Sequence, residues 1–107
     1  MEVSVQLLKQ LASLCFSAEH AHPSDVMSYL DQYPSIQSIH ALGGNGHGPY
    51  LILPKEDGVA DTLETLSTHG LERLGDDQAQ VYLQKFSLDH PVQLLKIVEQ
   101  LYPMCRE

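Results

Sequence analysis

The stretch that decides the fold of this chain is Ile36-Gln37-Ser38-Ile39-His40-Ala41-Leu42-Gly43-Gly44-Asn45-Gly46-His47-Gly48-Pro49-Tyr50-Leu51-Ile52-Leu53-Pro54. Residues 36–42 alternate imperfectly between apolar and polar side chains and are compatible with a strand. Residues 43–49 hold four glycines, which cost too much backbone entropy inside a helix or strand and therefore predict a loop. Residues 50–53 are a continuous apolar run closed by Pro54, which indicates a central strand buried on both faces.

Two helices are predicted before this stretch. From Val3 to Phe16, apolar residues recur every three or four positions, which is the spacing of one helical face. A second, short helix is predicted from the start signal at residues 23–25, and it must end before Pro34, whose ring disfavours helical geometry at the preceding residue. Its buried side is expected to consist of Val26, Met27, Leu30 and Tyr33.

Three further elements are predicted after the stretch. Asp57 is a candidate cap for a helix that lines up Val59, Leu63 and Leu66, and Gly70 is a candidate for the left-handed residue that ends it. Residues 71–77 are expected to form a turn-rich connection. Residues 79–86 alternate and predict a third strand, and residues 91–102 predict a last helix.

The predicted fold class is α+β, with residues 1–107 forming a single domain. The expected order is α-α-β-β-α-β-α, in which a mostly antiparallel sheet is covered by the amino-terminal and carboxy-terminal helices. A chain of 107 residues has room for one domain, and its 43% hydrophobic composition is enough to fill the core of such a domain.

The charge of the chain excludes several classes of partner. There are 14 acidic residues and 6 basic ones, for a formal net charge of -8. Nucleic acid is not expected as a partner, because there is no surplus of Lys and Arg to displace counterions from phosphates. Anionic membranes are not expected either, and the longest apolar runs fall far short of a bilayer span. With no secretory signal visible, the expected location is cytoplasmic.

The glycine-rich loop is the first candidate site. Successive backbone amides in such a loop can form an anion-binding concavity. The candidate ligand residues are Gly44, Asn45, Gly46, His47 and Gly48, with His47 a possible general base or anion contact. The alternative is a wide hairpin turn, because the Lys and hydroxyl of a phosphate-binding P-loop are absent and the glycine spacing does not fit G-x-G-x-x-G.

Residues 36–87 resemble the third motif of the GHMP kinase superfamily, which includes galactokinases and mevalonate kinases. In that family a strand enters a G-x-G-x-G loop and leaves through an apolar strand, a helix and another strand. Residues 44–48, 50–53, 59–68 and 81–86 follow that order here. The family's ATP-binding segment has no counterpart, and 107 residues cannot hold both of its domains. The resemblance therefore implies a module like the family's carboxy-terminal domain, without kinase activity.

No metal or other cofactor is predicted. His20 and His22 with Asp25 are possible metal donors, but a second ligand pair is missing, so a solvated loop is expected there. Cys15 is expected to be an inert thiol on an apolar helix face, and it could form a bridge with Cys105 only if the two chain ends meet.

The leading functional hypothesis is a non-enzymatic, acidic binding module that recognises another protein, as an adaptor, chaperone or regulator does. A basic partner would be steered to its carboxylates, and a second copy of the chain is a possible partner. The candidate contact residues are Asp61, Glu64, Asp76, Asp77 and Tyr102. The alternative hypothesis is a phosphate-ligand or catalytic module that uses loop 43–48, so the question of enzymatic activity stays open and leans towards none.

Overall fold

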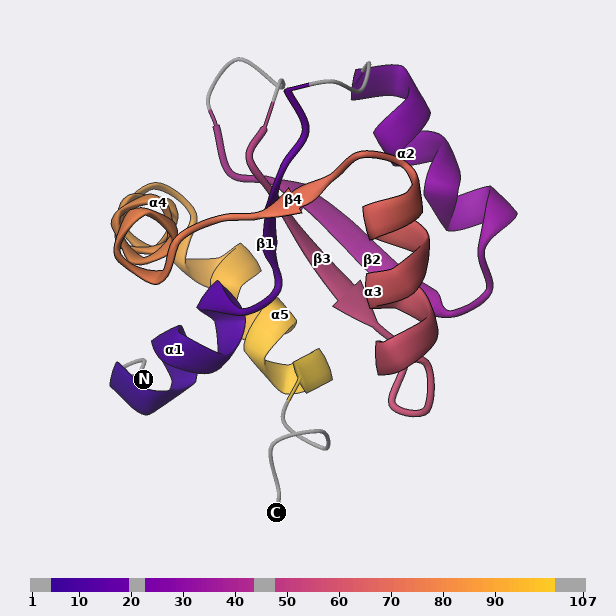
Figure 1. The fold of residues 1–107 in the computed structure, drawn as a ribbon. Helices are drawn as coiled ribbons and strands as arrows, with labels where there is room; N and C mark the ends of the chain where they lie inside the picture. Colours follow the sequence, from indigo (N-terminus) through magenta and orange to yellow (C-terminus); the bar gives the residue numbers. More distant parts are fainter. Residues whose placement is uncertain (1–4, 20–22, 44–47, 102–107) are drawn as a thin grey trace.

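The computed structural model describes residues 5–19, 23–43 and 48–101 of the chain as five helices and a four-stranded sheet (Figure 1). In chain order the elements are α1 (Val5–Ala12), β1 (Cys15–Ser17), α2 (Pro23–Gln32), β2 (Ile36–Ala41), β3 (Tyr50–Pro54), α3 (Val59–Thr68), β4 (Glu72–Arg73), α4 (Asp76–Asp89) and α5 (Pro91–Leu101). The predicted α+β class is confirmed, whereas the order of elements is α-β-α-β-β-α-β-α-α.

The sheet has the strand order β2-β3-β1-β4, and every neighbouring pair is antiparallel. Helix α2 connects β1 to β2 and helix α3 connects β3 to β4, so the two βαβ units interleave. This is the topology of the ferredoxin-like split βαβ motif. Helix α1 precedes the motif, and α4 and α5 follow it.

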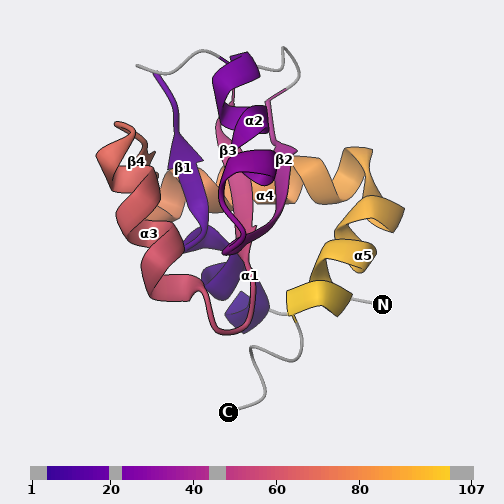
Figure 2. The same cartoon turned by 90° about the vertical axis from the view of Figure 1, so that its right-hand side faces the viewer.

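Helices cover both faces of the sheet. Figure 2 shows α2 and α3 on the side of the sheet that faces the viewer, with α1 and α4 behind it. Strand β3 contributes to both cores, because Tyr50 and Ile52 pack under α2 and α3 whereas Leu51 and Leu53 pack under α1, α4 and α5. The prediction of a central strand buried on both faces is confirmed. Burial of each of the aliphatic side chains Leu51, Ile52 and Leu53 stabilises the fold by about 1.5–3 kcal/mol.

Strand β2 confirms the strand predicted over residues 36–42 and explains its imperfect alternation. The pairing with β3 shifts between Ile36 and Ser38, so Gln37 is the extra residue of a β-bulge. Because of this shift Ile36 and Ile39 both reach the core under α2 and α3, although they are three positions apart. A regular strand would place them on opposite faces.

Helices α2 and α3 lie close to their predicted positions. Helix α2 ends at Gln32, before Pro34, and Gly70 has the left-handed φ of +82° expected after α3. Asp57 does not cap α3, because the N-cap position is Gly58 and no side chain caps it. A Cβ at Gly58 would lie 2.9 Å from the Cβ of Ser35, so glycine allows α3 to begin this close to β2.

The helix predicted over residues 3–16 is too long. Helix α1 ends at Ala12, and after a turn at residues 13–14 the chain continues as β1. Cys15 packs with the core under α1, α4 and α5, and Phe16 with the core under α2 and α3, so the side chains alternate as they do in a strand.

The strand predicted over residues 79–86 is wrong, since these residues belong to helix α4. The connection predicted over residues 71–77 contains β4 and the first turn of α4. Ala79, Leu83 and Phe86 are buried, at the spacing of four and three residues that one face of a helix produces. Apart from this error, the expected covering of the sheet by the two terminal helices is confirmed, because α1 and α5 both pack on one core.

Within residues 5–19, 23–43 and 48–101, the structure contains no helix that is both long enough and apolar enough to cross a bilayer.

Candidate functional site

The glycine-rich segment connects adjacent antiparallel strands, as the hairpin interpretation predicts. Gly44, Asn45, Gly46 and His47 lie outside the described residues, so the anion-binding hypothesis rests here on Gly48 alone. Gly48 has a φ of +92° and precedes a cis peptide bond to Pro49. It lines a pocket of 170 Å³ together with Ser17, Ala18, Glu19, Pro49, Leu74, Gln78 and Tyr82. Among the described residues of this lining there is a carboxylate, Glu19, and no Lys or Arg, which does not favour an anion.

Gly48→Ala is expected to destabilise the protein more than Gly70→Ala, although both glycines have a positive φ. At Gly70 a Cβ meets nothing within 4 Å, so only the left-handed backbone penalty of about 1–2 kcal/mol applies. At Gly48 a Cβ would lie 2.8 Å from the ring of Tyr50, which adds about 1–3 kcal/mol for overpacking. Urea denaturation of the two variants measures the difference, and equal losses would contradict the contact with Tyr50.

The acidic residues proposed as partner contacts fall on two different layers. Asp61 and Glu64 are exposed on α3. Asp76 and Asp77 are exposed in the first turn of α4, which packs on the opposite side of the sheet. Tyr102 lies outside the described residues. The structure therefore does not gather the predicted contact residues into one site.

The layer formed by α2 and α3 is more uniformly acidic than the sequence analysis suggested. Neither helix contains a Lys or Arg, whereas α1, α4 and α5 carry one Lys each. The exposed residues that define this surface, called the acidic face below, are Asp25, Met27, Leu30, Asp31, Asp61 and Glu64.

Met27 and Leu30 are the functional candidates that sequence reasoning missed. They were expected on the buried side of α2, yet they are 44% and 37% exposed. The buried residues of this helix are Val26 and Tyr29, which share a face at a spacing of three. Because Met27 and Leu30 are also three positions apart, they form a second apolar stripe, and the sequence contains no signal that tells which of the two stripes meets the sheet.

A cluster of three rings ties the ends of α2 and α3 together. His69 donates a hydrogen bond from Nδ1 to the carbonyl oxygen of Thr65 at 2.9 Å and accepts one at Nε2 from the Tyr33 hydroxyl at 2.8 Å. The rings of Tyr29 and Tyr33 both meet the His69 ring edge to face, with centroids 4.9 and 5.3 Å away. Burial, and then the Asp25 carboxylate, raise the pKa of Tyr29. These contacts hold the two helices of the acidic face in a fixed relation.

A second polar network connects β2 with α5. His40 Nε2 lies 3.0 Å from Ser38 Oγ, and Ser38 in turn donates to Gln100 Oε1 at 3.4 Å. Gln93 Nε2 lies 3.5 Å from His40 Nδ1, so an amide hydrogen points at Nδ1 and the ring proton is on Nε2. Burial lowers the pKa of His40, which favours this neutral ring. With its proton directed at Ser38, His40 is not placed to remove the serine proton, as a nucleophilic pair requires.

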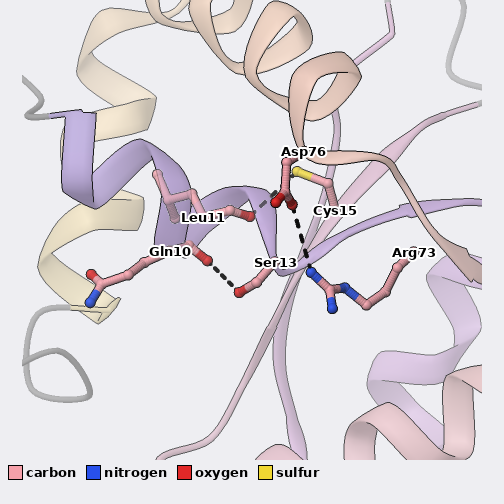
Figure 3. A network of polar contacts seen from close by, with 6 residues as sticks. All are labelled: Gln10, Leu11, Ser13, Cys15, Arg73 and Asp76. Atoms are coloured by element: carbon pink, nitrogen blue, oxygen red, sulfur yellow. Dashed lines mark hydrogen bonds and ion pairs between the residues drawn. The ribbon is translucent and has the colours of Figure 1, made fainter.

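Cys15 is fully buried, and it lies in β1 rather than on a helix (Figure 3). Its thiol donates to the carbonyl oxygen of Leu11 at 3.4 Å, and burial raises its pKa to about 12. A thiol with this pKa is not a nucleophile near neutral pH. Figure 3 also shows Asp76 directed at Arg73, 3.9 Å away, in an exposed pair. Cys105 lies outside the described residues, so a bridge with Cys15 is not tested.

No group of three metal-ligating side chains occurs within the part of the chain that the structure describes. His20 and His22, which the sequence analysis considered as donors, lie outside that part.

No family model, no curated protein and no solved structure matches this chain. The resemblance to GHMP kinases therefore stays a prediction. Of the elements on which it depends, the strand after α3 is β4 at residues 72–73, and residues 81–86 are helical.

Proposed function

We propose that this chain is a non-enzymatic protein-recognition module that binds a basic, partly apolar segment of another protein on its acidic face. The observation that carries the proposal is the composition of that face. Helices α2 and α3 lie on the same side of the sheet and expose Asp25, Asp31, Asp61 and Glu64 without a single Lys or Arg, and α2 also exposes Met27 and Leu30.

This composition matches the anatomy of protein interfaces. Apolar side chains such as Met supply the buried area of an interface, and charged residues surround that area and select the partner. Met adapts to differently shaped partners because it is flexible and polarisable. The net charge of -8 attracts a basic segment before contact and raises its association rate.

The scaffold supports recognition because it holds the acidic face rigid. The Tyr33–His69 hydrogen bond joins α2 to α3, and Thr62, on the buried side of α3, donates to the Ser35 carbonyl oxygen at 3.1 Å. A surface held in this way loses little conformational entropy when a partner binds.

The test uses two synthetic amphipathic helical peptides of equal length and equal Leu content, one with Lys and one with Glu at the polar positions. The Lys peptide is expected to shift the backbone amide resonances of α2 and α3, and the Glu peptide to leave them unchanged. Binding of the Lys peptide is expected to weaken as salt is added, because salt screens exposed charges.

Two charge-reversal variants locate the binding surface. Asp61→Lys with Glu64→Lys is expected to weaken binding of the Lys peptide by about tenfold, which corresponds to about 1.4 kcal/mol. Asp76→Lys with Asp77→Lys makes the same change of charge on α4 and is the matched control. The proposal is contradicted if the α4 variant loses binding and the α3 variant keeps it, or if both peptides bind equally well.

A further inference from the structure

Strand β2 forms one edge of the sheet and β4 forms the other. Figure 2 shows β2 at the margin of the sheet on the side of α5. The α5 side chains Gln93 and Gln100 reach the side chains of His40 and Ser38, and no described residue forms hydrogen bonds with the backbone of the outer edge of β2.

The register shows which backbone groups of β2 point outward. Leu42 donates from its backbone N–H to the Pro49 carbonyl oxygen at 2.8 Å, and His40 and Ser38 follow at steps of two in the same ladder. In an antiparallel pair the hydrogen-bonded residues alternate with residues whose N–H and C=O point away. Ile39 and Ala41 therefore direct their backbone groups towards the open edge. Ile52, the partner of Ile39, confirms this register because its N–H bonds to Leu14 on the β1 side.

The two edges of the sheet differ in how they are protected against pairing with another strand. Proteins protect edges with charged side chains, prolines, bulges or very short strands. Strand β4 is only two residues long, and both Glu72 and Arg73 are charged and exposed. Strand β2 has six residues and no charge, and the only such device in it is the bulge at Gln37, which leaves residues 38–41 regular.

Charge indicates which partner the open edge accepts. From Gln32 through Pro54 the sequence contains no Asp, Glu, Lys or Arg. Two copies that each carry a charge of -8 repel one another over most of their surface, and an uncharged strand is where they can approach at the lowest electrostatic cost. An antiparallel pair of identical strands also satisfies the outward groups of both copies across a two-fold axis.

We propose that the β2 edge is a homodimer interface, in which β2 of one copy pairs antiparallel with β2 of a second copy to form a continuous eight-stranded sheet. The interface uses the outward backbone groups of β2, whereas the acidic face consists of exposed side chains of α2 and α3. Added salt strengthens the dimer, because salt screens the repulsion between two acidic chains, whereas it weakens the binding of a basic peptide.

The experiment is sedimentation equilibrium of the full chain over a wide range of concentration, together with amide hydrogen exchange. The expected particle has twice the 11.9 kDa mass of one chain at high concentration. The amides of Ile39 and Ala41 are expected to exchange more slowly as the dimer forms. A monomer at all concentrations, or outward amides that exchange freely in the dimer, overturns the proposal.

Ala41→Pro is the decisive variant, because it removes an outward N–H and leaves the β2–β3 ladder intact. Proline is tolerated in edge strands at such positions, so the variant is expected to keep its circular dichroism spectrum and to sediment as a monomer. Ala41→Lys is expected to weaken the dimer, and the matched control Ala60→Lys, which adds the same charge on exposed α3, is expected to leave it unchanged. A folded Ala41→Pro variant that remains dimeric overturns the proposal.

Discussion

Leu83→Ala is expected to lower the free energy of unfolding by about 2–5 kcal/mol, whereas Val81→Ala is expected to change it by less than about 0.5 kcal/mol. Leu83 is fully buried against the core under α1 and α4, so its removal leaves a cavity. Val81 is 66% exposed on the same helix and loses little contact. Urea denaturation followed by circular dichroism measures both values.

This pair of variants also distinguishes helix α4 from the strand that alternation predicts over the same residues. In a strand, positions 81 and 83 point to the same face, so both truncations would have similar costs. In a helix the two positions are 200° apart, since each residue turns the chain by about 100°. Equal losses for Leu83 and Val81 would contradict the helix.

Cys15 is expected to react with a thiol reagent at pH 8 roughly 10³-fold more slowly in the folded protein than in the unfolded chain. Burial raises its pKa from 9.0 to about 12, and each unit reduces the thiolate fraction tenfold at this pH. The experiment uses the Cys105→Ser variant, in which Cys15 is the one thiol that can react with the reagent. Fast labelling under conditions where the protein stays folded would contradict the buried position in β1.

The same pKa predicts how stability depends on alkaline pH. Because the folded state holds the Cys15 proton more tightly than the unfolded state, the stabilisation is fully present below pH 9 and is lost as the pH rises towards 12. The free energy of unfolding that is lost in this way is about 4 kcal/mol, since a difference of one in pKa corresponds to about 1.4 kcal/mol. Cys15→Ala removes this contribution, so the free energy of unfolding of the variant is expected to depend less on pH above pH 9. Part of the loss of stability at alkaline pH is expected to remain in this variant, because burial also raises the pKa of the phenols of Tyr29 and Tyr50.

The elements that sequence reasoning located correctly are those whose signals are local. Tyr50 to Pro54 is apolar at every position, which only a strand covered on both faces requires. Proline at position 34 stops α2, and glycine at position 70 ends α3 with a positive φ. Each of these signals depends on the residue itself and needs no distant partner.

The errors arise where two periods fit the same residues or where an element is very short. In residues 79–86, Ala79, Val81 and Leu83 fit a strand, while Ala79, Leu83 and Phe86 fit a helix. The acidic residues Asp76 and Asp77 after Gly75 are a helix start signal that favours the second pattern. Strands β1 and β4 have three and two residues, too few to show any period.

The candidate site was only partly accessible to sequence reasoning. Asp61 and Glu64 were identified as contact residues, and both are exposed on the acidic face. Met27 and Leu30 were assigned to the core, because a helix with two apolar stripes does not reveal which one meets the sheet. The Tyr33–His69 bond joins residues 36 positions apart, a separation that no local pattern reports.

The sequence by itself determined the α+β class, the central strand at residues 50–53, the end of α2 before Pro34, the glycine that ends α3, and a strongly acidic composition, because these follow from local sterics, hydropathy and charge. Only the tertiary structure decided that residues 15–17 and 72–73 join the sheet, that α2 and α3 share one face, and that β2 is an edge. The physical reason is that strand pairing and helix packing are set by contacts between distant parts of the chain, and a strand completes its hydrogen bonds only through such partners.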